Sequence, residues 1–352
     1  MSYTYKSGST LHCVLCPHHC KMEEGERGKC GVRENRTGEL SLPLYGVLSA
    51  VSTDPIEKKP LYHFYPGSTI FSVGFYGCSF HCPFCQNYRI AQPADTGGRT
   101  KDASTAGSSG ASSGGAGFPG AGFLGAGRST SPEELVENAR RQGARSIAYT
   151  YSEPLVHFEW ILKAAKIARS YGLKNVLVSN GFINPKPAEE LLEVMDAANI
   201  DLKSFRPEFY EDIVGGKLEP VLAFIKRAAA TIHVEVTTLV IPGYTDSPRE
   251  ITDIAKFLAN IHPDIPLHLS CYYPAYKFDA PPTEPSVVFE LADTAKEHLN
   301  FVYPGNVGLS EITTLCPKCG ATLISRRGYR VEMPGISNGA CSRCGHPVPF
   351  PL

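Results

Sequence analysis

The cysteines are the residues of this sequence whose grouping points most directly to chemistry. Eleven of the twelve fall into three groups with short spacings: Cys13, Cys16, Cys20 and Cys30; Cys78, Cys82 and Cys85; and Cys316, Cys319, Cys341 and Cys344. Such grouping is what chelation requires, because a short piece of chain must direct several thiolates to one point. Cys271 stands alone and is predicted to be a buried core residue.

The middle group forms a C-x3-C-x2-C loop directly after an apolar run at residues 70–75. Three thiolates on one loop suit an iron–sulfur cube, in which each iron is held by one Cys thiolate. A cube has four corners, so Cys78, Cys82 and Cys85 leave one iron open to a ligand that is not protein. The alternative is a zinc site completed by His81 or by a distant residue.

The last group consists of two C-x-x-C-G knuckles, at Cys316–Gly320 and Cys341–Gly345. Four thiolates leave no open position on a zinc ion, so this pattern predicts a structural zinc-ribbon-like site, and a rubredoxin-like iron is the alternative. The first group is less specific. Cys13, Cys16, Cys20 and Cys30 could hold zinc or a second iron–sulfur cluster, and His12, His18 or His19 could replace a cysteine. Zinc is the favoured interpretation.

The elements that must position these loops alternate along the chain. Strands are predicted from apolar runs at residues 70–75, 145–151, 175–179, 198–202, 232–241 and 266–272, with 301–303 as a candidate seventh. Helical periodicity between them, for example over residues 155–170, indicates a parallel α/β sheet and favours a barrel or part-barrel. Ligands of such folds bind at the carboxyl ends of the strands.

The composition limits the classes of partner. The chain has 352 residues with 34 Lys and Arg against 35 Asp and Glu, so no net charge attracts nucleic acid or a membrane surface. No apolar run is long enough to span a membrane, and the start does not resemble a signal peptide. The protein is therefore predicted to be cytoplasmic, where cysteines are better metal ligands than disulfide partners.

The positions of the cysteine groups and of the predicted strands divide the chain into three regions. Residues 1–68 form a Cys-rich segment, residues 69–310 the α/β core, and residues 311–352 the zinc-ribbon-like domain. Residues 94–130 interrupt the core with a low-complexity insertion whose centre, Ala103–Gly127, is almost entirely Ala, Ser, Thr and Gly. Such a composition predicts a flexible surface insertion. The Pro- and Lys-rich residues 54–67 are either a substrate-facing loop or a solvated connector.

The cysteine loop resembles the cluster motif of the radical S-adenosylmethionine (SAM) enzymes, and Phe84 matches the aromatic residue before their last cysteine. The resemblance extends over nearly the whole chain, through Cys13–Cys20, Cys30–Arg33, Asp54–Pro60 and Tyr149–Pro154. It is to the radical SAM enzyme of the AmmeMemoRadiSam system, which is similar to pyruvate formate-lyase activating enzymes. This resemblance implies a partial (β/α)6 TIM-like barrel with a Cys-rich N-terminal segment and a zinc-ribbon-like tail.

The resemblance also implies a reaction and its ligands. Such enzymes cleave SAM reductively at a [4Fe–4S] cluster, and the resulting 5'-deoxyadenosyl radical abstracts hydrogen from the substrate. Residues expected near SAM lie at strand ends or in the cluster loop: Phe84, Glu153, Asn180, Asp201, Lys203, Ile241 and His268. Glu153 would accept from the SAM ammonium and Lys203 would face its carboxylate, while Ile241 would pack on adenine and His268 would contact the nucleoside.

Each of these roles has a structural alternative: a helix cap for Glu153, a turn for Asn180, a surface Lys for Lys203 and a satisfied core residue for His268. The expected substrate is a protein or peptide, with a Memo-type or Amme-type protein as one candidate, and the reaction needs a low-potential electron donor. The alternative function is a metal-binding scaffold or electron carrier without SAM chemistry.

Overall fold

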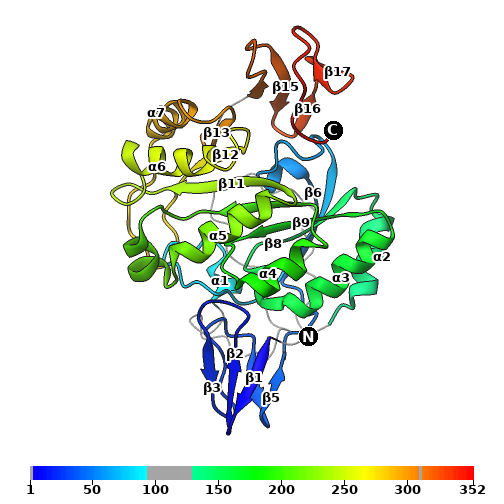
Figure 1. Cartoon of the computed structure of the whole chain (residues 1–352), viewed down its shortest axis with the longest axis vertical. Helices are drawn as coiled ribbons and strands as arrows, with labels where there is room; N and C mark the ends of the chain where they lie inside the picture. Colours follow the sequence, from blue (N-terminus) through cyan, green and yellow to red (C-terminus); the bar gives the residue numbers. More distant parts are fainter. Residues whose placement is uncertain (1–2, 93–128, 309–310) are drawn as a thin grey trace, which may run out of the picture.

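The computed structural model describes residues 3–92, 129–308 and 311–352. The predicted flexible insertion at Ala103–Gly127 lies outside these residues. The architecture is a three-part stack: a small sheet of N-terminal strands at one end, an α/β layer in the middle and a β-rich C-terminal module at the other end (Figure 1). No described helix is both long and apolar enough to cross a membrane.

The α/β layer is built on one eight-stranded sheet in the order β13-β12-β11-β10-β9-β8-β7-β6. Its strands are β6 (Ala50–Pro55), β7 (Thr69–Gly74), β8 (Ser146–Thr150), β9 (Lys174–Ser179), β10 (Ala197–Asp201), β11 (His233–Val240), β12 (Leu267–Cys271) and β13 (Val302–Gly305). All six strands predicted from the sequence are present, and the candidate seventh is β13. Strands β7 to β13 run parallel, and β6 pairs antiparallel with β7.

The sheet is open rather than closed. Its edge strands are β6 and β13, and they do not pair with one another in the described part of the chain. The prediction of a large parallel α/β sheet is therefore confirmed, whereas closure into a barrel is not seen. Strand β6 belongs to this sheet although it lies before residue 69, so the α/β layer draws on residues from the predicted N-terminal segment.

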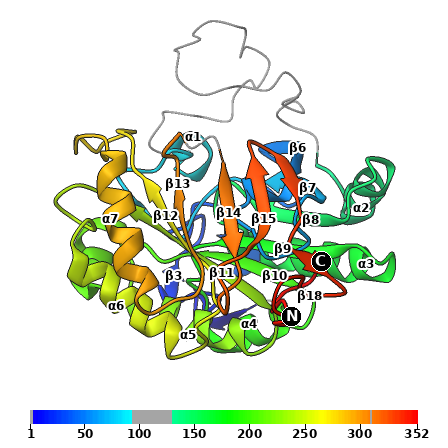
Figure 2. The same ribbon diagram turned by 90° about the horizontal axis from the view of Figure 1, so that it is seen from above.

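Helices cover one face of the sheet, as Figure 2 shows. They are α2 (Pro132–Arg141), α3 (Phe158–Ser170), α4 (Pro185–Leu192), α5 (Leu218–Ala229), α6 (Pro248–Ala259) and α7 (Pro285–Lys296). Ser131 and Ser247 cap α2 and α6 by accepting from the backbone N–H groups of Glu134 and Glu250. Each of these helices except α3 and α5 begins with Pro at its first position, where a missing N–H costs nothing.

The other face of the sheet is covered partly by the chain between β6 and β7. Side chains alternate between the two faces of a strand, so Ile147 and Tyr149 join the helix-side core while Ala148 points the other way. Ala148, with Ile70, Val176 and Ala197, packs against Ile56, Leu61 and Phe64. Residues 56–64 therefore fill this inner face and include the short 3-10 helix η1 (Ile56–Lys58).

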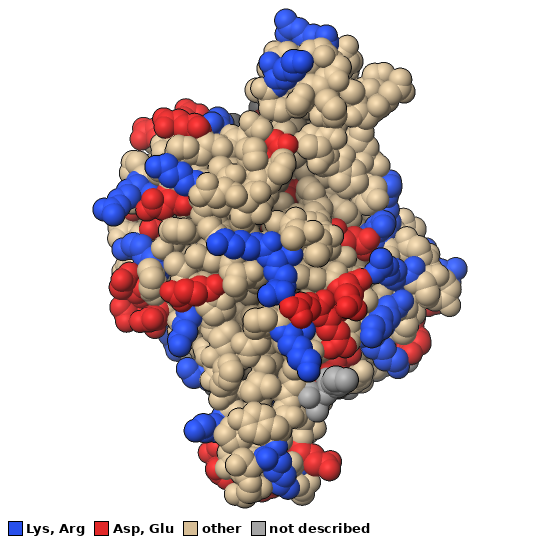
Figure 3. All heavy atoms as spheres, viewed as in Figure 1, with Lys and Arg blue, Asp and Glu red and all other residues tan. Residues whose placement is uncertain are grey.

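Two small modules flank the layer. The N-terminal module contains β1 (Thr4–Ser7), β2 (Thr10–Cys13), β3 (Cys20–Met22), β4 (Glu34–Arg36) and β5 (Glu39–Ser41). The C-terminal module contains β14 (Ile312–Leu315), β15 (Thr322–Arg327), β16 (Arg330–Glu332), β17 (Ile336–Ser337) and β18 (Ala340–Cys341). Lys and Arg alternate with Asp and Glu over the face seen in Figure 3, in keeping with the near-zero net charge.

Candidate functional site

The predicted cluster loop runs from the carboxyl end of β7 to the short helix α1 (Tyr88–Ala91). Hydrogen bonds to three neighbouring segments hold it. The Ser152 hydroxyl donates to the Phe75 carbonyl oxygen (2.9 Å), and the Gln92 side chain donates to that of Phe80 (2.7 Å). The His81 N–H donates to the Val214 carbonyl oxygen (2.9 Å), at the end of the π-helical segment η3 (Phe209–Val214). The loop is therefore a fixed part of the sheet's carboxyl edge.

The three thiols of this loop suit a polynuclear cluster better than a single ion. Thiolates that share one zinc lie only about 3.8 Å apart, given a Zn–S bond of about 2.3 Å in tetrahedral geometry. Among described residues, no three ligand atoms from this loop lie within 4.8 Å of one another, His81 included. Burial raises the pKa of Cys82 to about 12 and also raises the pKa of Cys78 well above its usual value, so without a metal these thiols are neutral near pH 7. The residues present thus fit a [4Fe–4S] cube.

Glu153 follows β8 and lies at the centre of the strand ends. One carboxylate oxygen accepts from the Ser179 hydroxyl (2.7 Å) and the Leu155 N–H (3.0 Å), and the other accepts from the Asn180 N–H (2.8 Å). The side chain is 1% exposed, and burial raises the pKa of Glu153 to about 7. The helix-cap role is real, because Glu153 is the N-cap of the 3-10 helix η2 (Pro154–His157), but the same carboxylate also ties β8 to β9.

Asn180 and Lys203 face the cluster loop from the next two strand ends. The Asn180 amide donates to the Ser79 hydroxyl (3.0 Å) and lies 3.8 Å from the Cys78 sulfur. Lys203 forms an ion pair with Asp201 (2.8 Å). Burial alone would lower the pKa of Lys203, but Asp201 and the Cys82 and Cys85 thiols outweigh it and raise this pKa. Lys203 is therefore a half-buried cation beside the cluster loop, with its side chain 19% exposed, and not a fully solvated surface Lys.

Phe84 and Ile241 lie on the apolar side of the same edge. Phe84 contacts the rings of Phe209 and Phe278, with centroid distances of 6.0 and 5.6 Å. Ile241 is fully buried directly after β11, where its N–H donates to the Thr245 hydroxyl (2.9 Å). These side chains give the strand ends an apolar wall.

His268 lies elsewhere. It is the second residue of β12, three residues before the carboxyl end, and its ring nitrogen lies 2.6 Å from a carboxylate oxygen of Glu235. Glu235 is fully buried and also accepts from the backbone N–H groups of Tyr62 and His63 (3.0 and 2.7 Å). Burial would raise the pKa of Glu235, but hydrogen bonds from His233 and His268 hold it well below its usual range. The structure thus places His268 in a buried ion-pair network rather than with the SAM-binding candidates.

Sequence reasoning missed a polar group at the inner face beside the cluster loop. Lys59 is buried and lies 3.0 Å from Asp54, and the Tyr151 hydroxyl donates to Asp54 (3.2 Å). Tyr151 adopts a positive φ of 70° and also lines a cavity of about 390 Å³ with Gln86, Asn87 and the start of β6. The signal was present in Asp54–Pro60 and Tyr149–Pro154, which carried the family resemblance, but the sequence did not indicate that the two segments meet. This cavity lies beside Gln86 and Asn87, the two residues that follow Cys85.

The C-terminal cysteines form a compact cluster. The sulfurs of Cys316, Cys319, Cys341 and Cys344 all lie within 4.8 Å of one another. The Cys316–Cys344 and Cys319–Cys341 pairs are each 3.7 Å apart, which matches the roughly 3.8 Å expected for thiolates on one tetrahedral ion. Gly320 and Gly345 have φ of 69° and 71°, as the predicted knuckle turns require. The geometry is compatible with a mononuclear zinc or iron site.

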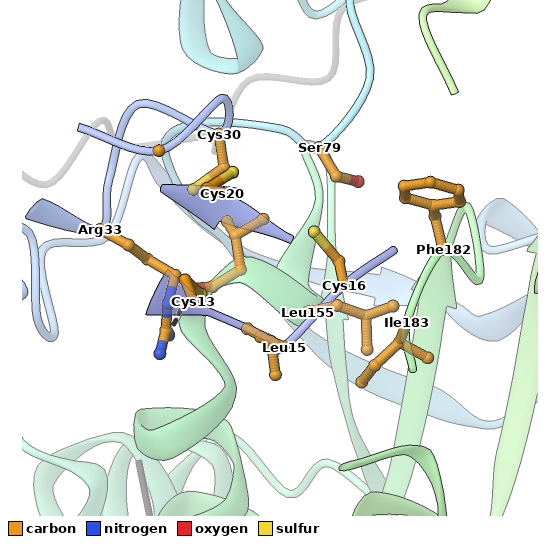
Figure 4. Close-up of a pocket in the computed structure, with 12 residues that line it drawn as sticks. Cys13, Leu15, Cys16, Cys20, Cys30, Arg33, Ser79, Leu155, Phe182 and Ile183 are labelled. Carbon is orange, nitrogen blue, oxygen red and sulfur yellow. Dashed lines mark hydrogen bonds between the residues drawn. The ribbon is translucent and has the colours of Figure 1, made fainter. Parts of the chain in front are cut away.

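The N-terminal cysteines surround a cavity of about 20 Å³ on the far side of the cluster loop (Figure 4). Cys13, Cys16, Cys20 and Cys30 line it together with Arg33, and Ser79 and Phe182 close it toward the cluster loop. The structure therefore brings all four predicted ligands of this group together and places them next to Cys78.

Comparisons with known proteins agree with this site. The Radical SAM superfamily matches residues 72–258. Uncharacterized protein MJ0808 of Methanocaldococcus jannaschii is 37% identical over 100% of this chain and 99% of its own length. GTP 3',8-cyclase of Heliobacterium modesticaldum is 33% identical over 35% of this chain and 39% of its own, and pyruvate formate-lyase 1-activating enzyme of Escherichia coli K12 is 27% identical over 30% and 44%. This chain belongs to the Radical SAM superfamily, which implies a [4Fe–4S] cluster and SAM as cofactors.

Proposed function

We propose that this protein is a radical SAM oxidoreductase that abstracts hydrogen from a protein or peptide substrate, in the manner of an activating enzyme. The observation that carries the proposal is the three-cysteine loop at the carboxyl end of β7, inside the region that matches the Radical SAM superfamily. When bound, the cluster and SAM would supply a one-electron cleavage of the sulfonium and a 5'-deoxyadenosyl radical. The one-electron reductant would be a low-potential donor.

The chain's own residues would bind and orient SAM. Cys78, Cys82 and Cys85 would hold three irons, and the fourth would be left for the amino acid part of SAM. Lys203 would face the SAM carboxylate, because it is a half-buried cation close enough to the Cys82 and Cys85 thiols to interact with them electrostatically. Asp201 would orient Lys203 through their 2.8 Å ion pair. Phe84 and Ile241 would form the apolar wall against adenine, and they would exclude water from the reacting atoms.

Glu153 and Asn180 would position the other side of the SAM site. Glu153 already accepts three hydrogen bonds, so we assign it chiefly the bracing of β8 and β9, with one remaining lone pair available to the SAM ammonium. Asn180 would hold the cluster loop through Ser79. We do not assign His268 to the nucleoside, since its ring is engaged by Glu235.

A protein or peptide substrate is supported by two observations. One relative is by name an activating enzyme of another enzyme, pyruvate formate-lyase 1. In addition, the open cavity beside Tyr151 is lined by Gln86 and Asn87, which directly follow Cys85, and at about 390 Å³ it is large enough for a side chain. We further propose that the protein is the radical SAM member of an AmmeMemoRadiSam system, with a Memo-type or Amme-type protein as partner, on the motifs quoted above.

The remaining expectations complete the proposal. The C-terminal cysteines would bind a structural zinc, because their sulfurs already have tetrahedral spacing. Residues 1–68, 69–310 and 311–352 would be the three units, with the reservation that β6 and residues 56–64 pack with the core. All twelve cysteines are free thiols in the structure, which suits a reducing, cytoplasmic location.

The direct test is formation of 5'-deoxyadenosine. The anaerobically reconstituted protein, given dithionite and SAM, should release this product in chromatography. Cys82→Ala should abolish it, whereas Cys271→Ala, which replaces a buried cysteine outside the three groups, should retain it. An intact cluster without product would instead support the scaffold or electron-carrier function.

The substrate class needs a separate measurement. Cells that make this protein can be grown in deuterated medium, and their extract divided into a washed macromolecular fraction and a small-molecule fraction. A protein or peptide substrate predicts deuterium in 5'-deoxyadenosine only with the macromolecular fraction. Deuterium transfer confined to the small-molecule fraction would contradict the substrate class but leave the radical chemistry standing.

A further inference from the structure

The N-terminal cysteines differ from the C-terminal ones in how far apart their sulfurs lie. Within residues 3–92, no three of Cys13, Cys16, Cys20 and Cys30 bring their sulfurs within 4.8 Å of one another, as Cys316, Cys319, Cys341 and Cys344 do. In a cube each thiolate binds a different iron, so the sulfurs are farther apart than those that share one ion. The N-terminal group, like the Cys78 loop, therefore lacks the close sulfur spacing of the C-terminal site.

The space between these sulfurs is hollow. The cavity of about 20 Å³ is lined by the four cysteines and by apolar side chains, Leu15, Leu155 and Phe182 among them. Such a volume is of the order that a single water requires, roughly 10–15 Å³, so the sulfurs are not packed directly against one another. An apolar wall around the sulfurs also excludes solvent, which protects a cluster from hydrolysis.

A buried cation faces the cavity with an unused hydrogen-bond donor. Arg33 is 2% exposed and lines the cavity, and its two terminal nitrogens bond to Glu159 at 2.7 and 2.8 Å. Its Nε has no hydrogen-bond partner among the described residues. A buried N–H without a partner is destabilising, so an acceptor is expected there. The sulfur of an anionic cluster is such an acceptor.

The neighbouring histidines are engaged elsewhere. The His18 Nε2 lies 2.7 Å from the Ser79 carbonyl oxygen, the His19 Nε2 lies 3.3 Å from the Asn184 amide, and His12 stacks on Tyr5. The ligand set is thus four cysteines, which leaves no open corner on a cube. This distinguishes the site from the Cys78 loop, which has three.

The two cysteine groups adjoin. A side chain at Gly77 would lie 2.5 Å from the Cys30 carbonyl oxygen, so the backbones on either side of the boundary touch, and Ser79 lines the cavity itself. Gly77 and Ser79 flank Cys78. We infer that Cys13, Cys16, Cys20 and Cys30 hold a second [4Fe–4S] cluster, fully ligated by the protein and placed beside the SAM-binding one. A site so placed suits transfer of one electron from a low-potential donor to the Cys78 loop.

The test uses the full chain with Cys78, Cys82 and Cys85 all replaced by alanine, reconstituted anaerobically with iron and sulfide. The inference predicts about four irons and about four sulfides per chain in this variant, with the Mössbauer spectrum of a cube. Further replacement of Cys16 and Cys20 by serine should remove this iron, while Cys271→Ser should not. Circular dichroism checks that each variant is folded.

Three results would overturn the inference: a triple variant that is folded and binds zinc but no iron at this site, one that binds a single iron, or one that binds two irons with two sulfides. If the triple variant does not fold, the wild-type protein decides. Its Mössbauer spectrum should account for about eight irons per chain as two cubes, and one cube per chain would contradict the second site.

Discussion

Replacement of Glu153 by glutamine should change the way stability depends on pH. In the folded protein the pKa of Glu153 is raised from 4.5 to about 7 by burial, which its three hydrogen bonds only partly offset. At about 1.4 kcal/mol for each pKa unit, ionising this carboxyl in the folded state costs about 3 kcal/mol more than in the unfolded chain. The stability that the protonated carboxyl contributes is therefore fully present below pH 4.5 and is lost as the pH rises through about 7.

Glutamine stays neutral at every pH between 4.5 and 8, so the variant does not lose stability through ionisation at this position. Its amide must place an N–H toward a donor, Asn180 or Ser179, which costs about 1–3 kcal/mol at every pH. Glu153→Gln should thus be less stable than wild type near pH 5 and recover relative to it by about 3 kcal/mol near pH 8. Urea unfolding of the cluster-free protein, followed by circular dichroism, measures the difference at each pH. Glu290→Gln, an exposed position on α7, is the matched control and should show no such trend.

Parallel pH profiles for wild type and Glu153→Gln would refute the reasoning, because they would mean that Glu153 has the same pKa folded and unfolded. A variant that loses stability relative to wild type as the pH rises would refute it more strongly, since it would show that the folded protein favours the charged carboxylate.

Three further predictions concern separate parts of the molecule. Lys203→Met should weaken SAM binding about 10- to 100-fold in equilibrium dialysis, because a charge-assisted hydrogen bond to a carboxylate contributes about 1.5–3 kcal/mol. Lys226→Met, on the exposed face of α5, is the control and should leave the affinity for SAM unchanged. An unchanged affinity in Lys203→Met would remove Lys203 from the site. Glu235→Gln breaks a buried network and should lower the free energy of unfolding by about 3 kcal/mol while the affinity for SAM stays the same; a lost affinity would instead return His268 to the SAM site. Cys319→Ser should remove zinc found by metal analysis and expose the C-terminal module to proteolysis, with Ser342→Ala as a control that retains the metal; a zinc-free wild-type protein would contradict the assignment.

Much of the sheet could be predicted, because parallel strands buried on both faces are continuous apolar runs. Residues 175–179 and 266–272 are such runs, and they form β9 and β12 to within a few residues. Strand β6 was missed because its sequence, Ala50–Pro55, is mostly small or polar and ends in Asp-Pro. It is an edge strand, where pairing with β7 and not apolar burial determines the structure.

The site could be predicted in outline but not in depth. Residue spacing shows that Cys78, Cys82 and Cys85 lie on one loop, and strand ends indicate that Glu153, Asn180 and Lys203 gather around it. The sequence does not show which neighbouring side chain a strand residue will contact. For this reason His268 was assigned to SAM, whereas in the structure its ring nitrogen lies beside the Glu235 carboxylate. Nor does it give the distances between thiols, so for the N-terminal group it left both zinc, the favoured interpretation, and a second cluster open.

The most direct test of the central claim is the EPR spectrum of the reduced protein with Cys16 and Cys20 replaced by serine, recorded with and without SAM. In this variant the Cys78 loop would hold the remaining cube, and the account predicts that SAM changes its g values by binding the open iron. A spectrum that SAM leaves unchanged, or a variant without any reducible cluster, would contradict the claim that Cys78, Cys82 and Cys85 hold a cube with one open corner.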